Sequence, residues 1–241
     1  MVLCFLLIFK EQLMKYGILC AMEEEIKDLR TNLHDLQKTV IGDVSFYQGT
    51  YAHKQVVLTR SGIGKVQAGM TTALLITEFK VDAVINSGSA GGIGAGLQVG
   101  EIVISSQTAY HDVDATAFGY QIGQLPQQPA RFVADPILQK SLQQAAEQAG
   151  LQAKIGLIVS GDQFVAGEAQ TAVIKQNFPD ALSCEMEGAA VAQVAYQFKK
   201  PFVIVRAMSD TADDQASQSF DDFIIDAGHR SAKMIMNFLA N

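Results

Sequence analysis

Apolar runs of strand length alternate with helix-like segments along almost the whole chain, and no other feature restricts the fold as strongly. The runs are short, nearly continuous and often β-branched, as in strands buried on both faces of a sheet. They cover residues 16–20, 55–59, 83–86, 101–105, 155–160, 182–186 and 202–208. Segments with helical periodicity lie between them, at residues 22–33, 65–79, 137–149, 187–198 and 220–239. Strands that alternate with helices are joined by crossover connections, which predicts a mainly parallel sheet flanked by helices.

A second strand signal modifies this prediction. Residues 44–60 are rich in strand-forming residues and indicate a local antiparallel hairpin, so the sheet should be mixed. No repeat, low-complexity tract or linker divides the chain, whose 241 residues suffice for one domain. The predicted fold class is therefore α/β, a single domain with a mixed, mainly parallel central β-sheet flanked by helices.

The first 13 residues need a separate interpretation. Val2–Phe9 is apolar, but it is far shorter than the roughly 20 residues that a membrane span requires. No basic residue precedes it and no small-residue cleavage signal follows it, as a signal peptide would need. We interpret residues 1–13 as a non-native or unused N-terminal extension and place the domain at residues 14–241.

Charge and cysteine content exclude several classes of partner. The formal net charge is −7, and the sequence has no dense basic run that could neutralise nucleic-acid phosphates. The cysteines Cys4, Cys20 and Cys184 are far apart in apolar segments, which indicates reduced thiols and a cytoplasmic protein. His111 and Asp112 are possible metal ligands, but a metal site needs three or four. The sequence therefore predicts no nucleic acid, no membrane and no metal.

Three glycine-rich segments resemble familiar motifs but do not match them. In "SGIGKV", Val66 stands where a phosphate-binding loop needs Ser or Thr. "GSAGGIGAG" does not give GxGxxG directly after a strand, and in "SGSAG" Ser87 replaces the first glycine of a nucleophile elbow. The glycines after residue 86 are instead expected to form a turn where backbone amides approach a ligand closely.

Polar and charged residues stand where several predicted strands end. They are Glu25, Ser89, Glu187, Arg206 and Asp210. The carboxyl ends of parallel strands meet at one edge of a sheet, where α/β proteins bind ligands. Each residue alone is explained as a helix cap, but charged groups gathered at one edge are costly unless they act on a ligand or on each other. Their convergence predicts a binding or catalytic site.

Seven segments then point to a known family. "GILCAMEEE", "SGIGKVQA", "NSGSAGG", "YHDVDATAFGYQIGQLP", "SGDQFV", "EMEGAAVA" and "RAMSDTAD" follow one another in this order. Together they resemble the 5′-methylthioadenosine/S-adenosylhomocysteine nucleosidases, from Met14 to the C-terminus. The resemblance implies a nucleoside phosphorylase-like fold and a homodimer. It also implies hydrolysis of the glycosidic bond of both nucleosides, and of 5′-deoxyadenosine, in methionine salvage, without metal or organic cofactor.

The resemblance implies a division of labour between two carboxylates. Adenine leaves poorly as an anion, so Asp210 is expected to protonate its N7, and burial against an apolar base would keep that acid protonated. Glu25 is expected to be the base that activates water. Glu23 and Glu24 are expected to be ordinary first-turn carboxylates that complement the helix dipole.

The same comparison assigns contacts to the water and the ribose. Ser89 and Arg206 would help to hold the attacking water, and Glu187 would accept both ribose hydroxyls, with Met186 beneath the sugar.

The adenine and alkylthio contacts follow from the same comparison. Phe164 would stack on adenine, Val165 would read the purine edge through its backbone, and Ile63 would contact the alkylthio group. Gln163 departs from the family, which commonly has a small residue there, and its side chain is expected to point away from the purine.

One long loop is unusually apolar. Residues 114–126 contain Phe118 and Pro126, and exposed apolar patches of this kind mark interfaces. By the resemblance, these two residues would close the neighbouring site of a homodimer.

Two other functions compete with the hydrolase. A phosphorylase on the same fold would use phosphate as nucleophile, but the negative charge of Glu25 would repel it. A non-catalytic nucleoside-binding protein would be expected to lose an acid or a base, whereas Glu25, Glu187 and Asp210 are all present.

Overall fold

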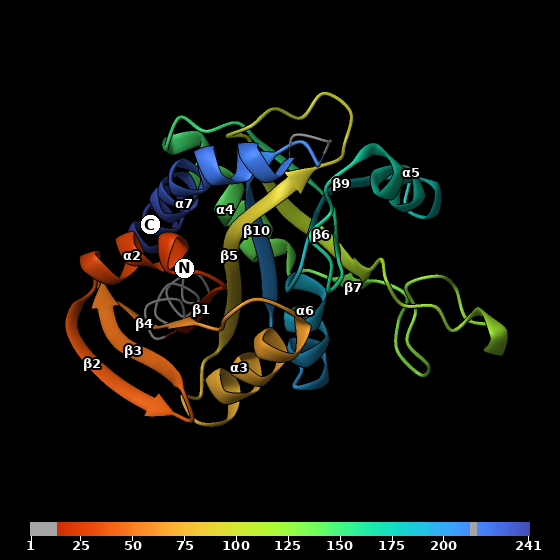
Figure 1. Cartoon of the computed structure of the whole chain (residues 1–241). Coiled ribbons are helices and arrows are strands. Elements are labelled where there is room, and N and C mark those ends of the chain that lie inside the picture. The colour runs from red at the N-terminus through yellow and green to blue at the C-terminus, as the bar shows by residue number, and fades with distance from the viewer. Residues whose placement is uncertain (1–13, 213–215) are drawn as a thin grey trace, which may run out of the picture.

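A mixed β-sheet forms the centre of the molecule, with helices on both sides (Figure 1). The computed structural model describes residues 14–212 and 216–241, without the side chains of residues 217–219, so the predicted extension at residues 1–13 lies outside the described part. The strands are β1 Lys15–Cys20, β2 His34–Ile41, β3 Val44–Tyr51, β4 Lys54–Arg60, β5 Ala83–Gly92, β6 Ile102–Tyr110, β7 Phe132–Val133, β8 Ala153–Ser160, β9 Ala181–Glu185 and β10 Phe202–Asp210. The helices are α2 Glu23–Asn32, α3 Lys65–Thr77, α4 Pro136–Gln148, α5 Glu168–Asn177, α6 Gly188–Gln197 and α7 Ala216–Ala240, with a 3₁₀ turn η1 at Thr116–Phe118.

Part of the sheet closes on itself. β5, β10, β6, β8 and β9 pair in a ring, while β1, β4, β3 and β2 extend from β5 as an open arm. Parallel pairing joins β1 to β4 and β5, β10 to β5, and β8 to β6 and β9. Antiparallel pairing joins β10 to β6, β9 to β5, β7 to β6, and β3 to both β2 and β4. The predicted α/β class with a mixed sheet is confirmed, and so is the hairpin at residues 44–60.

A fork in the sheet determines where a cavity can open. On one side, β5 pairs with β10 along residues 84–91. On the other side, it pairs with β1 over residues 83–86 and with β9 only at Gly91 and Gly92. β1 and β9 therefore diverge beside residues 87–90 of β5, and we call this place the fork.

The glycine-rich segment after residue 86 is strand and not the predicted turn. β5 continues to Gly92 because β10 supplies a parallel partner along its whole second half. β10 likewise continues past the predicted end to Asp210. Ser89 and Asp210 therefore lie on paired strands, which fixes their side chains more firmly than a loop would.

The helices form two groups on opposite sides of the sheet (Figure 1). α7 packs against β10, α2 and α4 on one side, and α3 packs against α6 on the other. Pro136 is the first residue of α4, and Asp135 caps the helix by accepting hydrogen bonds from Ile137 N and Leu138 N, each at 2.9 Å. In the described ranges, no helix combines the length and apolar character needed to cross a membrane.

The segment between β6 and β7 stands away from the rest of the molecule (Figure 1). It contains η1 and the apolar loop predicted from the sequence. The Phe118 side chain is 82% exposed, and Pro126 is also exposed. Within a single chain, this segment therefore leaves Phe118 and Pro126 in solvent, whereas Ile122 and Leu125 pack against the core.

Candidate active site

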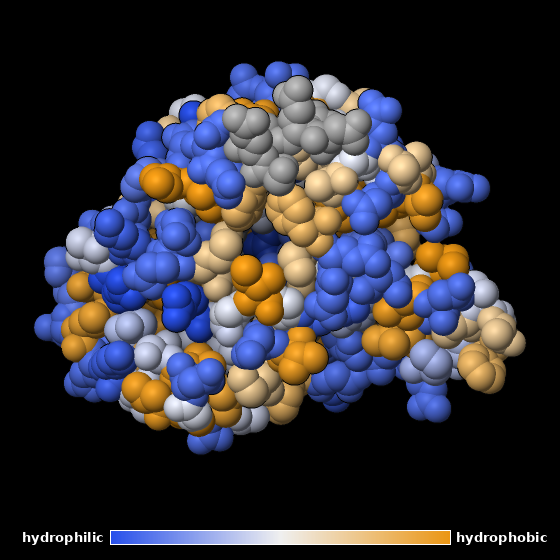
Figure 2. Space-filling model, in the orientation of Figure 1, coloured by the Kyte–Doolittle hydropathy of each residue, from blue (hydrophilic) through white to orange (hydrophobic). Residues whose placement is uncertain are grey.

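A cavity of about 590 Å³, its open mouth included, lies at the fork. Figure 2 shows a hollow in this face, with hydrophobic residues around its mouth and hydrophilic ones inside. Most of the site residues predicted from the sequence line this cavity: Glu25, Ile63, Ser89, Phe164, Val165, Met186, Glu187 and Asp210. Residues from six separate segments thus meet as expected for the carboxyl edge of a sheet.

Glu25 is buried on one side of the cavity. It is the third residue of α2, and its Oε2 accepts hydrogen bonds from Ala21 N at 2.9 Å and Met22 N at 3.0 Å. Its Oε1 accepts from Ser89 N at 2.9 Å and Ser89 Oγ at 3.0 Å. The amide of Ser89 is available because β5 has no strand partner on this side of the fork. Four donors therefore fix the orientation of this carboxylate.

Glu23 and Glu24, which precede Glu25 in the first turn of α2, face away from the cavity. Glu23 pairs with Arg30 at 2.5 Å, and Glu24 is exposed. Only the third position of the helix turns back toward β5, so Glu25 alone enters the site.

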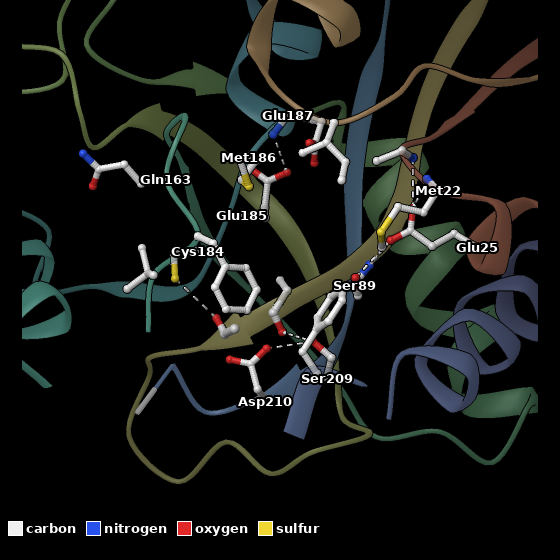
Figure 3. A pocket seen from close by; sticks show the side chains of 17 residues that line it. Met22, Glu25, Ser89, Gln163, Cys184, Glu185, Met186, Glu187, Ser209 and Asp210 are labelled. Atoms are coloured by element: carbon white, nitrogen blue, oxygen red, sulfur yellow. Dashed lines mark hydrogen bonds between the residues drawn. The ribbon is translucent and has the colours of Figure 1, made fainter. Parts of the chain in front are cut away.

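Asp210 lies on a different side of the same cavity, and Figure 3 shows it apart from both Glu25 and Glu187. It is buried at the end of β10. Its Oδ2 accepts a hydrogen bond from Ser209 Oγ and its Oδ1 from Ala212 N, both at 2.8 Å. The two buried carboxylates thus face the cavity from separate elements.

Two glycines of β5 make room for these carboxylates. A Cβ atom at Gly88 would lie 2.8 Å from Glu25 Oε1, and one at Gly91 would lie 2.9 Å from Asp210 Oδ1. Such contacts are closer than Cβ atoms tolerate. The glycines therefore let protein carboxylates approach the strand, instead of serving the close backbone approach to a ligand that the sequence suggested.

A buried cluster of charge, formed by Glu185, Glu187 and Arg206, lies at one wall of the cavity. Arg206 forms an ion pair with Glu185, and its Nη2 also lies 3.8 Å from Glu187 Oε2. Arg206 is buried and does not itself line the cavity, although both of these glutamates do. Glu185 was not predicted, although strand alternation places residues 185 and 187 on the same face and could have revealed it.

Glu187 has an unusual protonation behaviour. Burial, followed by the nearby negative charge of Glu185, raises the pKa of Glu187 from 4.5 to about 8. Arg206 and the Gly64 amide oppose this shift, and the amide donates to Glu187 Oε1 at 2.8 Å. In the free protein, this carboxyl therefore holds a proton near neutral pH.

We expect the stability of the ligand-free protein to report this proton. Between about pH 5 and 8, the folded state holds a proton on Glu187 that the unfolded chain has released, so the free energy of unfolding falls as pH rises. Glu187→Gln removes this contribution and should be more stable than the wild type at pH 8 by on the order of 1–3 kcal/mol. Urea unfolding at a series of pH values measures the difference. Parallel pH profiles for the two proteins would contradict it.

Aromatic and aliphatic side chains form the rest of the wall. The Phe164 ring is 46% exposed and meets Phe220 edge-on, with centroids 5.6 Å apart. Gln163 lies at the exposed edge of the cavity, and Figure 3 shows its amide directed away from the carboxylates. The lining also contains residues that no strand-end signal marked: Met22, Cys184, Ser209 and Phe220.

Two further predicted residues, besides Arg206, are absent from the cavity lining of this chain. Phe118 and Pro126 belong to the projecting segment and do not line it. The prediction places both residues at the cavity of a neighbouring subunit.

One of the two possible metal ligands, Asp112, has other partners. Asp112 accepts hydrogen bonds from Lys65 Nζ at 2.6 Å and Asp162 N at 2.9 Å. Among the residues that the structure describes, no group of three or more His, Cys, Asp or Glu side chains is arranged to hold a metal ion.

Comparison with known proteins gives a consistent result. A model of the phosphorylase superfamily matches residues 15–240. The 5′-methylthioadenosine/S-adenosylhomocysteine nucleosidase of Staphylococcus carnosus is 47% identical over 223 residues, 92% of this chain and 98% of the relative. The crystal structure of the Neisseria meningitidis nucleosidase in complex with methylthio-immucillin-A is 48% identical, with a TM-score of 0.93 over 95% of this chain and 99% of the other. The nucleosidase of Colwellia psychrerythraea in complex with adenine is 44% identical, with a TM-score of 0.92 over 94% of each chain.

Proposed function

This chain belongs to the phosphorylase superfamily and, within it, to the 5′-methylthioadenosine/S-adenosylhomocysteine nucleosidases, and from this premise we propose how its cavity performs the reaction. It is an N-glycosidic hydrolase of methionine salvage that releases adenine from both nucleosides. The observation that carries the mechanism is the pair of buried carboxylates, Glu25 and Asp210, on separate sides of one cavity. We propose that the enzyme also hydrolyses the glycosidic bond of 5′-deoxyadenosine.

Asp210 acts on the leaving group. Breaking the C1′–N9 bond makes the sugar an oxocarbenium-like cation, and adenine leaves easily only when an acid has protonated N7. Asp210 donates this proton, while the Ser209 hydroxyl and the Ala212 amide hold its carboxyl in place.

Glu25 activates the water that attacks C1′ from the other face. A carboxylate has about four lone-pair sites, and backbone amides and Ser89 occupy all of them here. The Ser89 hydroxyl is the one donor that can rotate, so it turns from Glu25 to the incoming water. The buried Arg206 Nε has no hydrogen-bond partner among the described residues, which supports a role for Arg206 in holding the water.

The remaining residues bind the nucleoside. When the nucleoside binds, Glu187 releases to solvent the proton that it holds in the free protein; as a carboxylate it then accepts hydrogen bonds from both ribose hydroxyls and stabilises the positive sugar, with Met186 beneath it. Phe164 stacks on the base, which is typically worth about 1–3 kcal/mol. Val165 reads the purine edge through its backbone, and Ile63 contacts the alkylthio group.

The lining of the cavity favours water over phosphate as nucleophile. Among the described residues that line it, none is a lysine or an arginine, whereas Glu25, the proposed base, is a carboxylate on the side from which the nucleophile attacks. A phosphate dianion would meet strong repulsion at such a surface.

Adenine release from 5′-methylthioadenosine in phosphate-free buffer tests the proposed mechanism. We expect full turnover without phosphate and without added metal. A strict phosphate requirement would support a phosphorylase, and substrate binding without turnover would support a non-catalytic binding protein.

We also propose a homodimer. Exposed apolar residues of the projecting segment, of the first turn of α3 and of the cavity lining support it: Phe118 is 82% exposed, Val66 81% and Ile63 55%. In this arrangement, Phe118 and Pro126 close the neighbouring cavity on its alkylthio side.

Phe118→Asp should weaken this dimer and raise KM for alkylthio substrates by up to about tenfold, since one lost aromatic contact is worth about 0.5–1.5 kcal/mol. Analytical ultracentrifugation and steady-state kinetics measure the two effects. Val173→Asp, at an exposed apolar residue of α5, is the matched control. A monomeric Phe118→Asp protein with undiminished activity would show that catalysis does not need the dimer.

Two further expectations stay proposals. We place the catalytic domain at residues 14–241, supported by the family match that begins at residue 15, with residues 1–13 as an extension outside it. We place the protein in the cytoplasm, supported by Cys20 and Cys184, which are both free and buried.

A further inference from the structure

Three charged residues outside the cavity join two loops that border it. One loop, residues 61–64, precedes α3, and the other, residues 161–165, follows β8. Lys65, Asp112 and Asp162 lie between these loops, and none of them lines the cavity. We call these three residues the latch.

The first contact of the latch is a helix cap supplied from another loop. α3 begins at Lys65, and its N-cap residue Gly64 has no side chain to satisfy the first amides. With φ at +99°, Gly64 has a backbone conformation that favours glycine, so a local capping side chain is disfavoured. Asp162 Oδ1 accepts a hydrogen bond from Lys65 N at 2.9 Å instead, which places a carboxylate at the positive end of α3.

Two further contacts hold Asp162 in this position. Asp112 Oδ2 accepts from Lys65 Nζ at 2.6 Å and from Asp162 N at 2.9 Å, and Lys65 Nζ also lies 3.5 Å from Asp162 Oδ2. The Lys65 and Asp112 side chains are only 21% and 14% exposed, so solvent screens this pair incompletely. Burial alone would raise the pKa of Asp112, but hydrogen bonds from Lys65 and Asp162 lower it below its ordinary value.

The latch reaches the cavity through Gly64. A Cβ atom at Gly64 would lie 3.2 Å from Asp162 Oδ1, so the glycine backbone packs directly against the capping carboxylate. The amide of the same glycine donates to Glu187 Oε1 at 2.8 Å. Any movement of Asp162 away from α3 therefore releases the residue that orients Glu187.

We propose that Asp162, held by Lys65 and Asp112, is a positioning residue for the nucleosidase reaction. It fixes residues 61–64 against residues 161–165 and thereby orients Glu187 toward the ribose. This role rests on the proposed contact between Glu187 and the ribose hydroxyls. The latch itself touches no substrate.

Three variants separate positioning from simple stabilisation. Asp162→Ala removes the cap, whereas Asp162→Asn keeps an acceptor of a type favoured at helix N-termini. Asp135→Ala is the matched control, because it removes the aspartate cap of α4, which does not border the cavity. All three proteins are compared by thermal unfolding and by steady-state kinetics on 5′-methylthioadenosine.

We expect Asp162→Ala to raise KM about tenfold, which is the effect expected from the loss of one helix cap. The kcat of this variant should stay within about threefold of the wild-type value. Asp162→Asn should restore KM to within about threefold of the wild type. Asp135→Ala should lose similar stability and keep its KM. Equal KM values for the two alanine variants, or no rescue by asparagine, would overturn the proposal.

A 2′,3′-dideoxy analogue of the substrate tests the route through Glu187. The ratio of kcat/KM between 5′-methylthioadenosine and this analogue measures the contribution of the hydroxyls. The ratio should shrink in both Asp162→Ala and Glu187→Gln. A smaller ratio in Glu187→Gln alone would overturn the positioning role of Asp162. An unchanged ratio in Glu187→Gln would instead refute the ribose contact of Glu187, and the KM comparison above would still decide on Asp162.

Discussion

Asp210→Asn should lower kcat for 5′-methylthioadenosine by about 10²–10⁴-fold, the usual contribution of a positioned acid. The asparagine keeps the shape of the side chain, but it cannot transfer a proton to N7. This proton transfer stabilises the transition state and not bound substrate, so substrate affinity should change little. Single-turnover kinetics and equilibrium binding measure the two quantities separately.

The fold should tolerate this substitution. The asparagine Oδ1 can still accept from Ala212 N, and its amide can donate to the Ser209 hydroxyl, which is able to accept. Asp135→Asn is the matched control, because it makes the same chemical change at the cap of α4. Near-normal turnover by Asp210→Asn would show that another group is the acid.

Much of the fold could be predicted because its signals are local. The alternation of apolar runs and helical segments predicts the α/β class, and Asp135-Pro136 marks the start of α4 to the residue. The closed ring could not be predicted, because β9 meets β5 only at Gly91 and Gly92, a pairing of residues about ninety positions apart.

Elements with polar sequences also escaped prediction. β2 is exposed along nearly its whole length and has no apolar alternation. α5 buries only Thr171 and Ile174, so its helical periodicity is weak. Both elements depend on tertiary contacts more than on their own sequence pattern.

The site shows the same division between local and long-range signals. Its carboxylates could be placed because charge at the end of a buried strand is conspicuous. The ion pair between Arg206 and Glu185 could not be predicted, because the sequence does not show which of two glutamates an arginine will pair with. The latch was equally hidden, since Asp162 and Asp112 bond backbone amides that any residue would supply.

Glu25→Gln should also lower kcat by about 10²–10⁴-fold, here because the attacking water loses its base. Its effect on stability should differ from that of Asp210→Asn. Both Glu25 oxygens accept from backbone amides, at residues 21 and 22 on one side and Ser89 on the other. A glutamine amide must point its own N–H group at one of these donors, which should cost about 1–3 kcal/mol. Urea unfolding and kcat measured on the same preparations report both effects.

A substrate with a better leaving group separates the two carboxylates. The 5-methylthioriboside of para-nitrophenol leaves as a stable anion, so its departure needs no proton from Asp210. Asp210→Asn should therefore recover most of its lost rate on this substrate, whereas Glu25→Gln should stay slow, because water attack still lacks its base. The wild type on the same substrate gives the reference rate for each variant. Equal recovery of both variants would mean that both carboxylates serve the departure of the leaving group. Asp210 as the acid and Glu25 as the base for water would then be a wrong assignment.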